Sequence, residues 1–416
     1  MNADNAFNPT AQDFPMHDNA LLYQVNTMKK AHGQGAATDI VNAAAAASAH
    51  RFHQKFANYA PTALLTLPHL AHKLDLASIH VKNEAERFGL NAFKSLGGSY
   101  AIGRYLAQRL GRDINDLSFA ELASPQVKAQ LGDLTFITAT DGNHGRGVAW
   151  AAEQLGMKAV VLMPHGSSPV RAENIRKHGA QCTITDFNYD DAVREANRLA
   201  EANGWVMVQD TAWDGYEEIP TWIMQGYLTL ADETAAQLPA APTHLILQAG
   251  VGSFAGAIAG YFVATMADNP PTIIVAEPHQ AHCLYRSAVA ADGKAHNVGG
   301  AMQTIMAGLA CGEPNIISWP ILRDYAAAFI SADDHLAANG MRIAAAPRPG
   351  TDPAFISGES GAIGLGLLYE LKTCPQYQAI CRDLALDEQA RVLLISTEGD
   401  TSPDIYEAIV WQGRNR

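Results

Sequence analysis

Cysteine is scarce in this sequence, with five residues scattered over a chain of 416. They are Cys182, Cys283, Cys311, Cys374 and Cys381, and no two of them form a C-x-x-C pair. This spacing predicts neither a disulfide framework nor a structural zinc site, and we expect no metal. Cys283 and Cys311 flank one Gly- and Met-rich stretch, so a pair between them stays open, although free thiols in a reducing compartment are the simpler expectation.

Basic residues are also few: 29 Lys and Arg stand against 42 Asp and Glu, which gives a formal net charge of −13. Nucleic-acid phosphates and anionic membrane surfaces both attract clustered Lys and Arg, so we expect this chain to bind neither. The hydrophobic fraction of 48% and the charged fraction of 17% are typical of a folded globular protein. The length predicts two domains.

Long apolar runs are nearly absent. One uncharged stretch, residues 243–267, has the length to span a bilayer, but four glycines interrupt it together with His244 and Gln248. We therefore read it as a strand, a glycine-rich turn and a helix. Residues 1–5 contain no basic region followed by an apolar run, so we expect no signal peptide and a cytoplasmic protein.

What the sequence does contain is an alternation of short β-branched runs and amphipathic helical stretches. Helices are expected over residues 43–47 and 192–200, among others, and strands alternating with helices predict an α/β fold with mainly parallel sheets. No linker divides the chain, so a second domain is expected as an insertion into the first. The strands are expected at residues 79–82, 134–139, 159–163, 182–185, 206–209, 244–247, 273–276, 328–330 and 392–395.

Ligands of parallel α/β folds bind beyond the carboxyl ends of the strands, where loops meet helix N-termini. The loop at residues 248–256 is rich in glycine and precedes a helix of small residues, which favours an anion. Gly250, Gly252 and Ala255 also match the dinucleotide pattern G-x-G-x-x-G/A, and Glu277 ends the next strand. A nicotinamide enzyme and a turn without a ligand are therefore both alternatives for this loop.

A second loop contains Lys94, between Phe93 and a Ser-x-Gly-Gly turn that opens a helix. A lysine amine becomes a nucleophile at neutral pH when desolvation or a neighbouring cation lowers its pKa. The alternative is an ordinary surface lysine whose stem lies on apolar neighbours. By itself this loop does not decide between the two.

Polar residues crowd two further loops. Residues 138–147 cap a strand and open a helix, with more polar side chains and glycines than a helix cap needs, so this loop can present N–H groups to a carboxylate. Residues 394–401 end another strand with hydroxyl groups, one of which can hydrogen-bond a heterocycle nitrogen. Each signal alone is weak, because Ser, Thr and Asp are common at such positions.

Taken together, these loops resemble the fold-type II pyridoxal-phosphate enzymes, the group of threonine dehydratase and tryptophan synthase β. Lys94 matches the lysine that holds the cofactor, Asn143 the asparagine loop, residues 250–253 the phosphate cup and residues 359–362 a Glu/Pro-Ser-Gly-Ala helix start. Four motifs in the right order are more specific than one, and a nicotinamide enzyme would leave Lys94 and the asparagine loop unexplained. The resemblance implies pyridoxal 5'-phosphate as the cofactor.

The same resemblance implies an architecture of two three-layer α/β/α domains with mainly parallel twisted sheets and an active site in the cleft between them. We expect a large cofactor-binding domain from residues 1–97 and 235–416, and a small inserted domain from residues 98–234.

Further segments are similar to one family within this group, the diaminopropionate ammonia-lyases. The similarity runs from about residue 60 to residue 412 and implies that D- and L-2,3-diaminopropionate are cleaved to pyruvate and two ammonia, in amino-acid catabolism, by a homodimer. The alternative is a serine/threonine dehydratase, although these usually have a small residue at the position of Asp141. The segments are residues 91–99, 138–147, 210–213, 219–227, 305–315 and 396–401.

The resemblance also implies roles for individual residues. A substrate with a second cationic amine requires an acidic group near its β-carbon, and Asp141 and Asp210 supply one. We expect Asp141 to act on one face of the substrate, and Lys94 with Asp210 on the other, as the catalytic residues. A non-catalytic binding protein would need neither the lysine nor the two aspartates.

The remaining expected contacts follow from the same motifs. A hydroxyl is expected beside the ring nitrogen of the cofactor, with Thr397 as the first candidate and Ser396 as the second. The expected cofactor-binding residues are Phe93, Lys94, Asn143, Gly250, Val251, Gly252, Ser253 and Thr397. The expected substrate-binding residues are Ser95, Thr140, Asp141, Gly142, His144 and Asp210.

Overall fold

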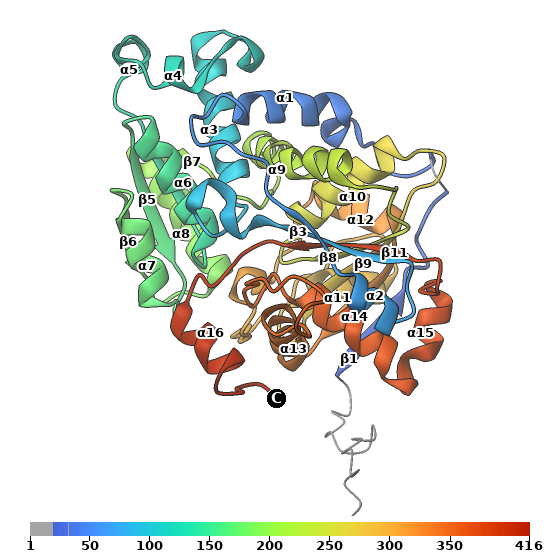
Figure 1. Ribbon diagram of the computed structural model, residues 1–416. Coiled ribbons are helices and arrows are strands. Elements are labelled where there is room, and N and C mark those ends of the chain that lie inside the picture. Colours follow the sequence, from blue (N-terminus) through green and yellow to red (C-terminus); the bar gives the residue numbers. More distant parts are fainter. Residues whose placement is uncertain (1–19, 32) are drawn as a thin grey trace, which may run out of the picture.

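The computed structural model describes residues 20–31 and 33–416 and contains two β-sheets, each covered by helices on both faces (Figure 1). The expectation about a signal peptide at residues 1–5 lies outside the described residues. Within the described part of the chain, no helix combines the length and the apolar character that crossing a membrane requires. Residues 243–267 form a strand, a turn and a helix, as predicted.

The larger sheet has seven strands, with parallel pairing in its interior and an antiparallel strand at each edge. Their order across the sheet is β1 (Leu21–Val25), β10 (Ala326–Ala332), β9 (Thr272–Pro278), β8 (His244–Gln248), β11 (Arg391–Ser396), β3 (Ser78–Asn83) and β2 (Leu64–Thr66).

The smaller sheet has four parallel strands and lies entirely within the middle of the sequence. Their order is β6 (Gln181–Ile184), β5 (Lys158–Met163), β4 (Thr135–Ala139) and β7 (Val206–Met207). All nine predicted strands are therefore confirmed, each to within two residues at either end, and the α/β class with mainly parallel sheets is confirmed with them.

Apolar residues on the two faces of the larger sheet enter two separate cores. Leu245 and Leu247 of β8 pack on one side, whereas Ile246 between them packs on the other, as the two-residue period of a strand requires. The helices of the first face are α1 (Ala43–His53), α9 (Glu218–Gln237), α10 (Ser253–Thr265), α11 (Cys283–Ala290) and α12 (Ser318–Tyr325). Those of the second are α2 (Pro68–Lys73), α13 (Asp334–Ala345), α14 (Ile363–Thr373) and α15 (Gln378–Asp383), and α16 (Pro403–Val410) packs on α13.

The smaller sheet is sandwiched in the same way. The helices on one face are α3 (Ser95–Leu110), α6 (Asn143–Gln154) and α7 (Pro169–Arg176), and α8 (Tyr189–Asn203) covers the other. Two short helices, α4 (Phe119–Leu122) and α5 (Pro125–Leu131), follow α3.

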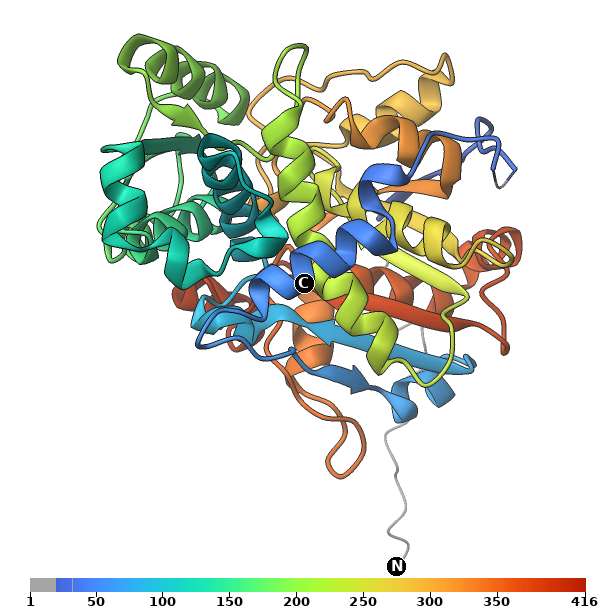
Figure 2. The same ribbon diagram turned by 90° about the horizontal axis from the view of Figure 1, so that it is seen from above.

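Helix α9 joins the two halves, because it packs against α3 and also against α1 and α10 (Figure 2). The approach to α3 is close at Gly226, where a Cβ atom would lie 2.5 Å from the carbonyl oxygen of Leu96. Only glycine fits there, since real Cβ atoms do not approach a backbone oxygen so closely. This contact seats the first turn of α3, which begins directly after Lys94.

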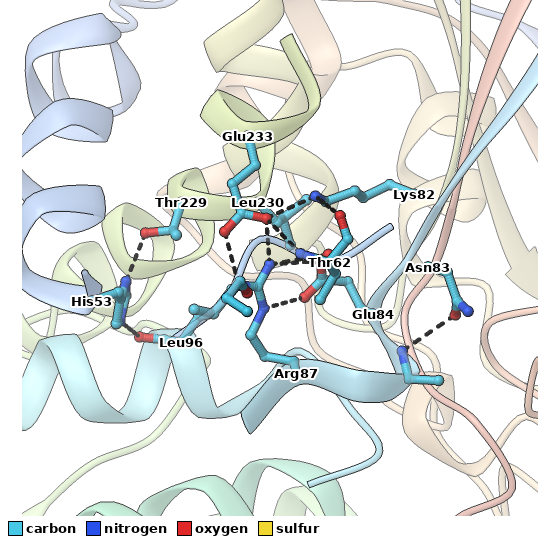
Figure 3. Close-up of polar contacts among 12 residues, drawn as sticks. His53, Thr62, Lys82, Asn83, Glu84, Arg87, Leu96, Thr229, Leu230 and Glu233 are labelled. Carbon is cyan, nitrogen blue, oxygen red and sulfur yellow. Dashed lines mark hydrogen bonds and ion pairs between the residues drawn. The ribbon is translucent and has the colours of Figure 1, made fainter. Parts of the chain in front are cut away.

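Four charged side chains form a buried ion network beside the same helix (Figure 3). Arg87 contacts Glu84 through Nε at 2.8 Å and Glu233 through Nη2 at 2.7 Å, and Lys82 Nζ lies 2.7 Å from the same Glu233 oxygen. All four side chains are at most 3% exposed, and Thr62 donates a further hydrogen bond to Glu84. The network ties β3 and the following 3-10 helix, Glu84–Gly89, to α9.

Candidate active site

A pocket lies beyond the carboxyl ends of β4, β7, β8 and β11, between the loops of the two sheets. Its wall contains every residue that the sequence predicted for the site except Ser95 and Gly142, which adjoin it in the chain. The residues that line it are Phe93, Lys94, Thr140, Asp141, Asn143, His144, Tyr189, Asp210, Tyr227, Gln248, Ala249, Gly250, Val251, Gly252, Ser253, Phe254, Gly308, Leu309, Cys311, Ser360, Thr397 and Glu398.

Lys94 sits at the start of α3, and its Nζ atom contacts Oδ2 of Asp210. Burial lowers the pKa of the Lys94 amine, but the Asp210 carboxylate, together with Tyr227 and Asp141, outweighs burial, so the pKa lies above its ordinary value. This is the opposite of the lowered pKa that a nucleophilic lysine requires, and its cause is the aspartate. In the chain alone, Lys94 is therefore an ammonium held by a carboxylate.

Asp210 is itself held by several groups. Burial raises the pKa of its carboxyl, but the Lys94 ammonium, together with His144 and the hydrogen bond from Tyr189, outweighs burial and keeps the group ionised. Its Oδ1 atom accepts hydrogen bonds from Tyr189 Oη at 3.3 Å and from Gln209 Nε2 at 3.2 Å. Its backbone oxygen accepts one from the Ser253 hydroxyl, which links Asp210 to the glycine-rich loop.

Asp141 contacts a different cation, Arg171 of α7, whose Nη1 atom lies 3.3 Å from Asp141 Oδ2. The Arg171 side chain is only 4% exposed and also reaches the other half of the molecule. Its Nε atom donates to Ser402 Oγ at 3.0 Å, and its Nη2 atom lies 3.7 Å from Glu359 Oε2. Arg171 therefore connects the loop after β4 with segments that surround β11.

Two glutamates lie next to this arginine. Glu398 accepts hydrogen bonds from the Asn143 side chain and, at 2.9 Å, from the backbone N–H of Ser360. Glu359 is 1% exposed, and its Oε1 atom has no hydrogen-bond partner among the described residues. Burial, followed by the repulsion of Glu398, raises the pKa of Glu359 to about 7.

The glycine-rich loop forms a cup at the first turn of α10. Gly252 has a φ of +102°, and a Cβ atom there would lie 2.8 Å from Ser318 Oγ. A Cβ at Gly250 would lie 3.1 Å from Cys311 Sγ. The positions of Gly250 and Gly252 thus leave no room for a side chain. The N–H groups at the start of a helix lack partners within the helix, so the cup suits an anion.

Another part of the pocket wall carries a hydroxyl. Thr397 Oγ1 accepts a hydrogen bond from Gln248 Nε2 at 3.0 Å, so its own proton is available to a group in the pocket. Ser396 Oγ donates instead to Ser357 Oγ at 2.8 Å and does not line the pocket. Of the two expected hydroxyls, Thr397 is therefore the one that faces a ligand.

Several predicted residues shape the loop itself. Thr140 Oγ1 accepts hydrogen bonds from the backbone N–H groups of Gly142 and Gly145, at 2.9 and 3.1 Å. Gly142 lies against Arg171, where a Cβ atom would be 3.0 Å from Cδ. Ser95 is buried, and its hydroxyl has no partner among the described residues.

Sequence reasoning missed part of the pocket wall. Tyr189 reaches it from the start of α8, outside every quoted motif. Tyr227, Phe254 and Cys311 lie inside quoted segments, but their side chains were not assigned to the site. Gln248, Ser360 and Glu398 lie inside quoted motifs, so their polar character next to strand ends was an available signal. Cys283 and Cys311 are both free and buried.

The chain is similar to known proteins along most of its length. Residues 56–381 match the family described as pyridoxal-phosphate dependent enzyme. The diaminopropionate ammonia-lyase of Salmonella typhimurium is 66% identical over 404 residues, covering 96% of this chain and 100% of that protein. The protein of the same name from Escherichia coli is 52% identical over 371 residues, covering 88% of this chain and 91% of its own length.

The fold is shared as well. The crystal structure of Escherichia coli diaminopropionate ammonia lyase in complex with D-serine matches with a TM-score of 0.88 and 48% sequence identity, covering 95% of this chain and 98% of that chain. The expected fold type II is confirmed by this match. Because the family match spans more than half of the chain and the Salmonella typhimurium relative matches along its whole length, the chain belongs to the family of pyridoxal-phosphate-dependent enzymes, within the group of the diaminopropionate ammonia-lyases.

Proposed function

We propose that this chain is a pyridoxal-phosphate-dependent lyase that cleaves both D- and L-2,3-diaminopropionate to pyruvate and two ammonia. The observation that carries the proposal is the pocket, which combines one lysine with two aspartates held by different partners. Asp210 contacts Lys94, and Asp141 contacts Arg171. The 66% identity to a diaminopropionate ammonia-lyase over 404 residues supports the same assignment.

The residues of the pocket fit the cofactor. The cup at residues 250–253 can receive the phosphate, since a Cβ at Gly252 would collide with Ser318 and the first N–H groups of α10 suit an anion. Thr397 has a proton to donate to the ring nitrogen, and Lys94 offers the amine that would hold the cofactor. When bound, pyridoxal phosphate supplies an electron sink for the electrons released at the α-carbon of the substrate.

The protein's own groups then move the protons. With the Lys94 amine next to the substrate, its Nζ atom can take the α-proton of one enantiomer, and the adjacent Asp210 carboxylate stabilises the resulting ammonium. The Asp141 carboxylate, ion-paired to Arg171, can take the α-proton of the other enantiomer. The two aspartates thereby serve opposite faces of the substrate.

A serine/threonine dehydratase is the alternative. Asp141 argues against it, because a carboxylate in this loop would repel the substrate carboxylate unless a β-ammonium lies nearby. Serine and threonine carry a neutral hydroxyl at the β-carbon, which does not offset the repulsion between Asp141 and the substrate carboxylate. The acidic side chain that lines the pocket therefore favours the diamine.

The finer organisation of the protein is part of the proposal. A small domain over residues 98–234, inserted into a large domain of residues 1–97 and 235–416, is supported by the strands, since all four of the smaller sheet fall within the insertion and all seven of the larger sheet outside it. We also propose a cytoplasmic homodimer that acts on a small amino acid and not on nucleic acid. The net charge of −13 supports the last point.

The test is the stoichiometry of the reaction. Purified protein loaded with pyridoxal phosphate is given D- or L-diaminopropionate, and pyruvate and ammonia are measured in the same sample. We expect two ammonia for each pyruvate with both enantiomers. Turnover of serine or threonine alone, with one ammonia per keto acid, would identify a dehydratase and overturn the proposal.

A further inference from the structure

Two buried side chains of the pocket wall, His144 and Tyr227, have a polar atom without a hydrogen-bond partner among the described residues, and His144 is the one that can accept from a cation. His144 is 1% exposed, and its Nε2 atom lies 2.8 Å from the backbone oxygen of Val208. A carbonyl oxygen only accepts hydrogen bonds, so Nε2 must carry a proton. The Nδ1 atom has no hydrogen-bond partner among the described residues.

The surroundings keep this imidazole neutral. Burial lowers the pKa of His144, and the nearby Lys94 ammonium lowers it further, whereas Asp210, Val208 and Asp141 act in the opposite direction without reversing the shift. With its single proton on Nε2, the ring presents a bare lone pair at Nδ1. His144 is therefore an acceptor at Nδ1, and the residue lines the pocket.

The lone pair faces a second acceptor. Asp210 Oδ2 lies 3.9 Å from His144 Nδ1, and both side chains line the pocket. A nitrogen at about 2.8 Å from both atoms would see them roughly 90° apart, which is close to the angle between two N–H bonds of an ammonium group. In the chain alone, Lys94 Nζ already contacts Oδ2, so Nδ1 is the one of the two acceptors that lacks a partner among the described residues, and a donor with two protons can serve both.

We propose that His144 Nδ1 and Asp210 Oδ2 together bind the β-ammonium of the substrate and thereby select an amine over a hydroxyl. This inference rests on the proposed function. A β-hydroxyl has one proton and can serve only one of the two acceptors, so His144 Nδ1 stays buried and unpaired whenever the hydroxyl donates to Asp210. Leaving one buried polar group unpaired costs about 10- to 100-fold in affinity.

Two substitutions separate this role from a purely structural one. In His144→Asn, the side-chain oxygen can take the place of Nδ1 and keep the pocket-facing acceptor, while the contact with Val208 is lost. In His144→Gln, the side-chain amide can reach the Val208 oxygen as Nε2 does, while the pocket-facing acceptor is lost. If the role of His144 is purely structural, the preference for diaminopropionate should survive better in His144→Gln. If His144 binds the β-ammonium, it should survive better in His144→Asn.

A second buried histidine is the matched control. His244 is 3% exposed, and its Nε2 atom lies 2.8 Å from the backbone oxygen of Leu384. Its Nδ1 atom, however, is partnered by Thr243 Oγ1 at 2.7 Å, and the residue does not line the pocket. His244→Gln therefore repeats the loss of one buried imidazole without touching the pocket.

The experiment compares affinities for diaminopropionate and alanine, which lacks the β-amine. Calorimetry is carried out on cofactor-loaded protein with Lys94→Ala, so that binding is measured without turnover, alone and combined with each substitution. We expect His144→Gln to lower the preference for diaminopropionate by about 10-fold or more. His144→Asn should keep it within about threefold of the parent protein, and His244→Gln should leave it unchanged.

The kcat/KM ratio of diaminopropionate to serine, measured with Lys94 in place, is expected to follow the same order, and thermal unfolding verifies that each variant is folded. Equal losses of preference in the Asn and Gln variants, or a better-preserved preference in Gln, would overturn the inference. Suppose that the unsubstituted enzyme releases two ammonia per pyruvate, but the Asn variant does not keep the preference for diaminopropionate better than the Gln variant. Then only the role of His144 is wrong. If the unsubstituted enzyme does not cleave diaminopropionate at all, the proposed function itself fails.

Discussion

The protein buries charged side chains in two places, and the two differ in how well their polar atoms are paired. In the buried ion network, Glu233 is contacted by both Lys82 and Arg87, and Glu84 is contacted by Arg87 and Thr62 (Figure 3). Around the pocket, by contrast, buried atoms of His144, Glu359 and Thr401 have no hydrogen-bond partner among the described residues.

This difference in pairing indicates which cluster stabilises the fold and which takes part in the reaction. A buried charge is tolerated when it is paired and fully hydrogen-bonded, and breaking such a pair leaves an uncompensated charge. An unpaired buried atom raises the free energy of the folded chain unless a ligand later pairs with it. We therefore expect substitutions in the ion network to lower stability, and substitutions in the pocket to lower activity.

The largest effect is expected from Lys94→Ala. Without the amine, the pocket loses the group that would hold the cofactor and one of its proton acceptors, so pyruvate formation should fall by at least about 10⁴-fold. The cofactor absorbance of the purified protein should change with it. Lys158→Ala, at a side chain that is 72% exposed, is the control and should remain active. Retained turnover in Lys94→Ala would remove the lysine from the mechanism.

Next comes Glu233→Gln, which breaks the ion network without removing volume. The Lys82 and Arg87 cations would then share Glu84 as their remaining carboxylate partner, and the free energy of unfolding should fall by about 3–5 kcal/mol. Asp232→Asn, one residue earlier at a half-exposed ion pair with His50, should cost at most about 1 kcal/mol. Denaturant titrations measure both, and similar losses would contradict the distinction.

Asp141→Asn should discriminate between the enantiomers. If Asp141 and the Lys94–Asp210 pair serve opposite faces of the substrate, one enantiomer should lose about 100-fold in kcat/KM more than the other. The amide keeps the shape of the side chain near Arg171, so folding is expected to be preserved. Equal losses for D- and L-diaminopropionate would show that the assignment of faces is wrong.

A smaller effect is expected from Glu359→Gln, and it depends on pH. The pKa of Glu359 is raised to about 7, so the folded protein holds this proton more tightly than the unfolded chain does. Stability should therefore fall as the pH rises from the ordinary carboxyl pKa toward 7, and the amide removes that decline. We expect the variant to be about 1–2 kcal/mol more stable than the parent at pH 8 and no more stable at pH 4. A constant difference at every pH would refute this.

Much of the fold could be predicted from the sequence, because parallel strands buried on both faces are continuous apolar runs. The two strands that were missed, β1 and β2, are antiparallel edges, and β2 is only three residues long. An edge strand needs no continuous apolar run, so nothing marks it. The loops that form the pocket could also be predicted, because they lie next to the ends of these apolar runs.

The pairing of the charges could not be predicted in this way. Arg171 lies 30 residues from Asp141 and joins it to Glu359 only through the fold. Lys82 lay within a predicted strand, and a lysine in a strand that packs on both sides could have indicated a buried carboxylate partner. That partner, Glu233, is 151 residues away in α9, and no local pattern connects the two.

The most direct test of the division between the two clusters measures stability and activity in the same pair of variants, Glu233→Gln and Asp210→Asn. We predict that Glu233→Gln loses several kcal/mol of unfolding free energy but keeps its kcat/KM per folded molecule, because it does not line the pocket. Asp210→Asn should lose about 100-fold or more in kcat/KM for diaminopropionate while its stability changes by less than that of Glu233→Gln. The reverse pattern, an active but unstable Asp210→Asn and a stable but inactive Glu233→Gln, would contradict the account.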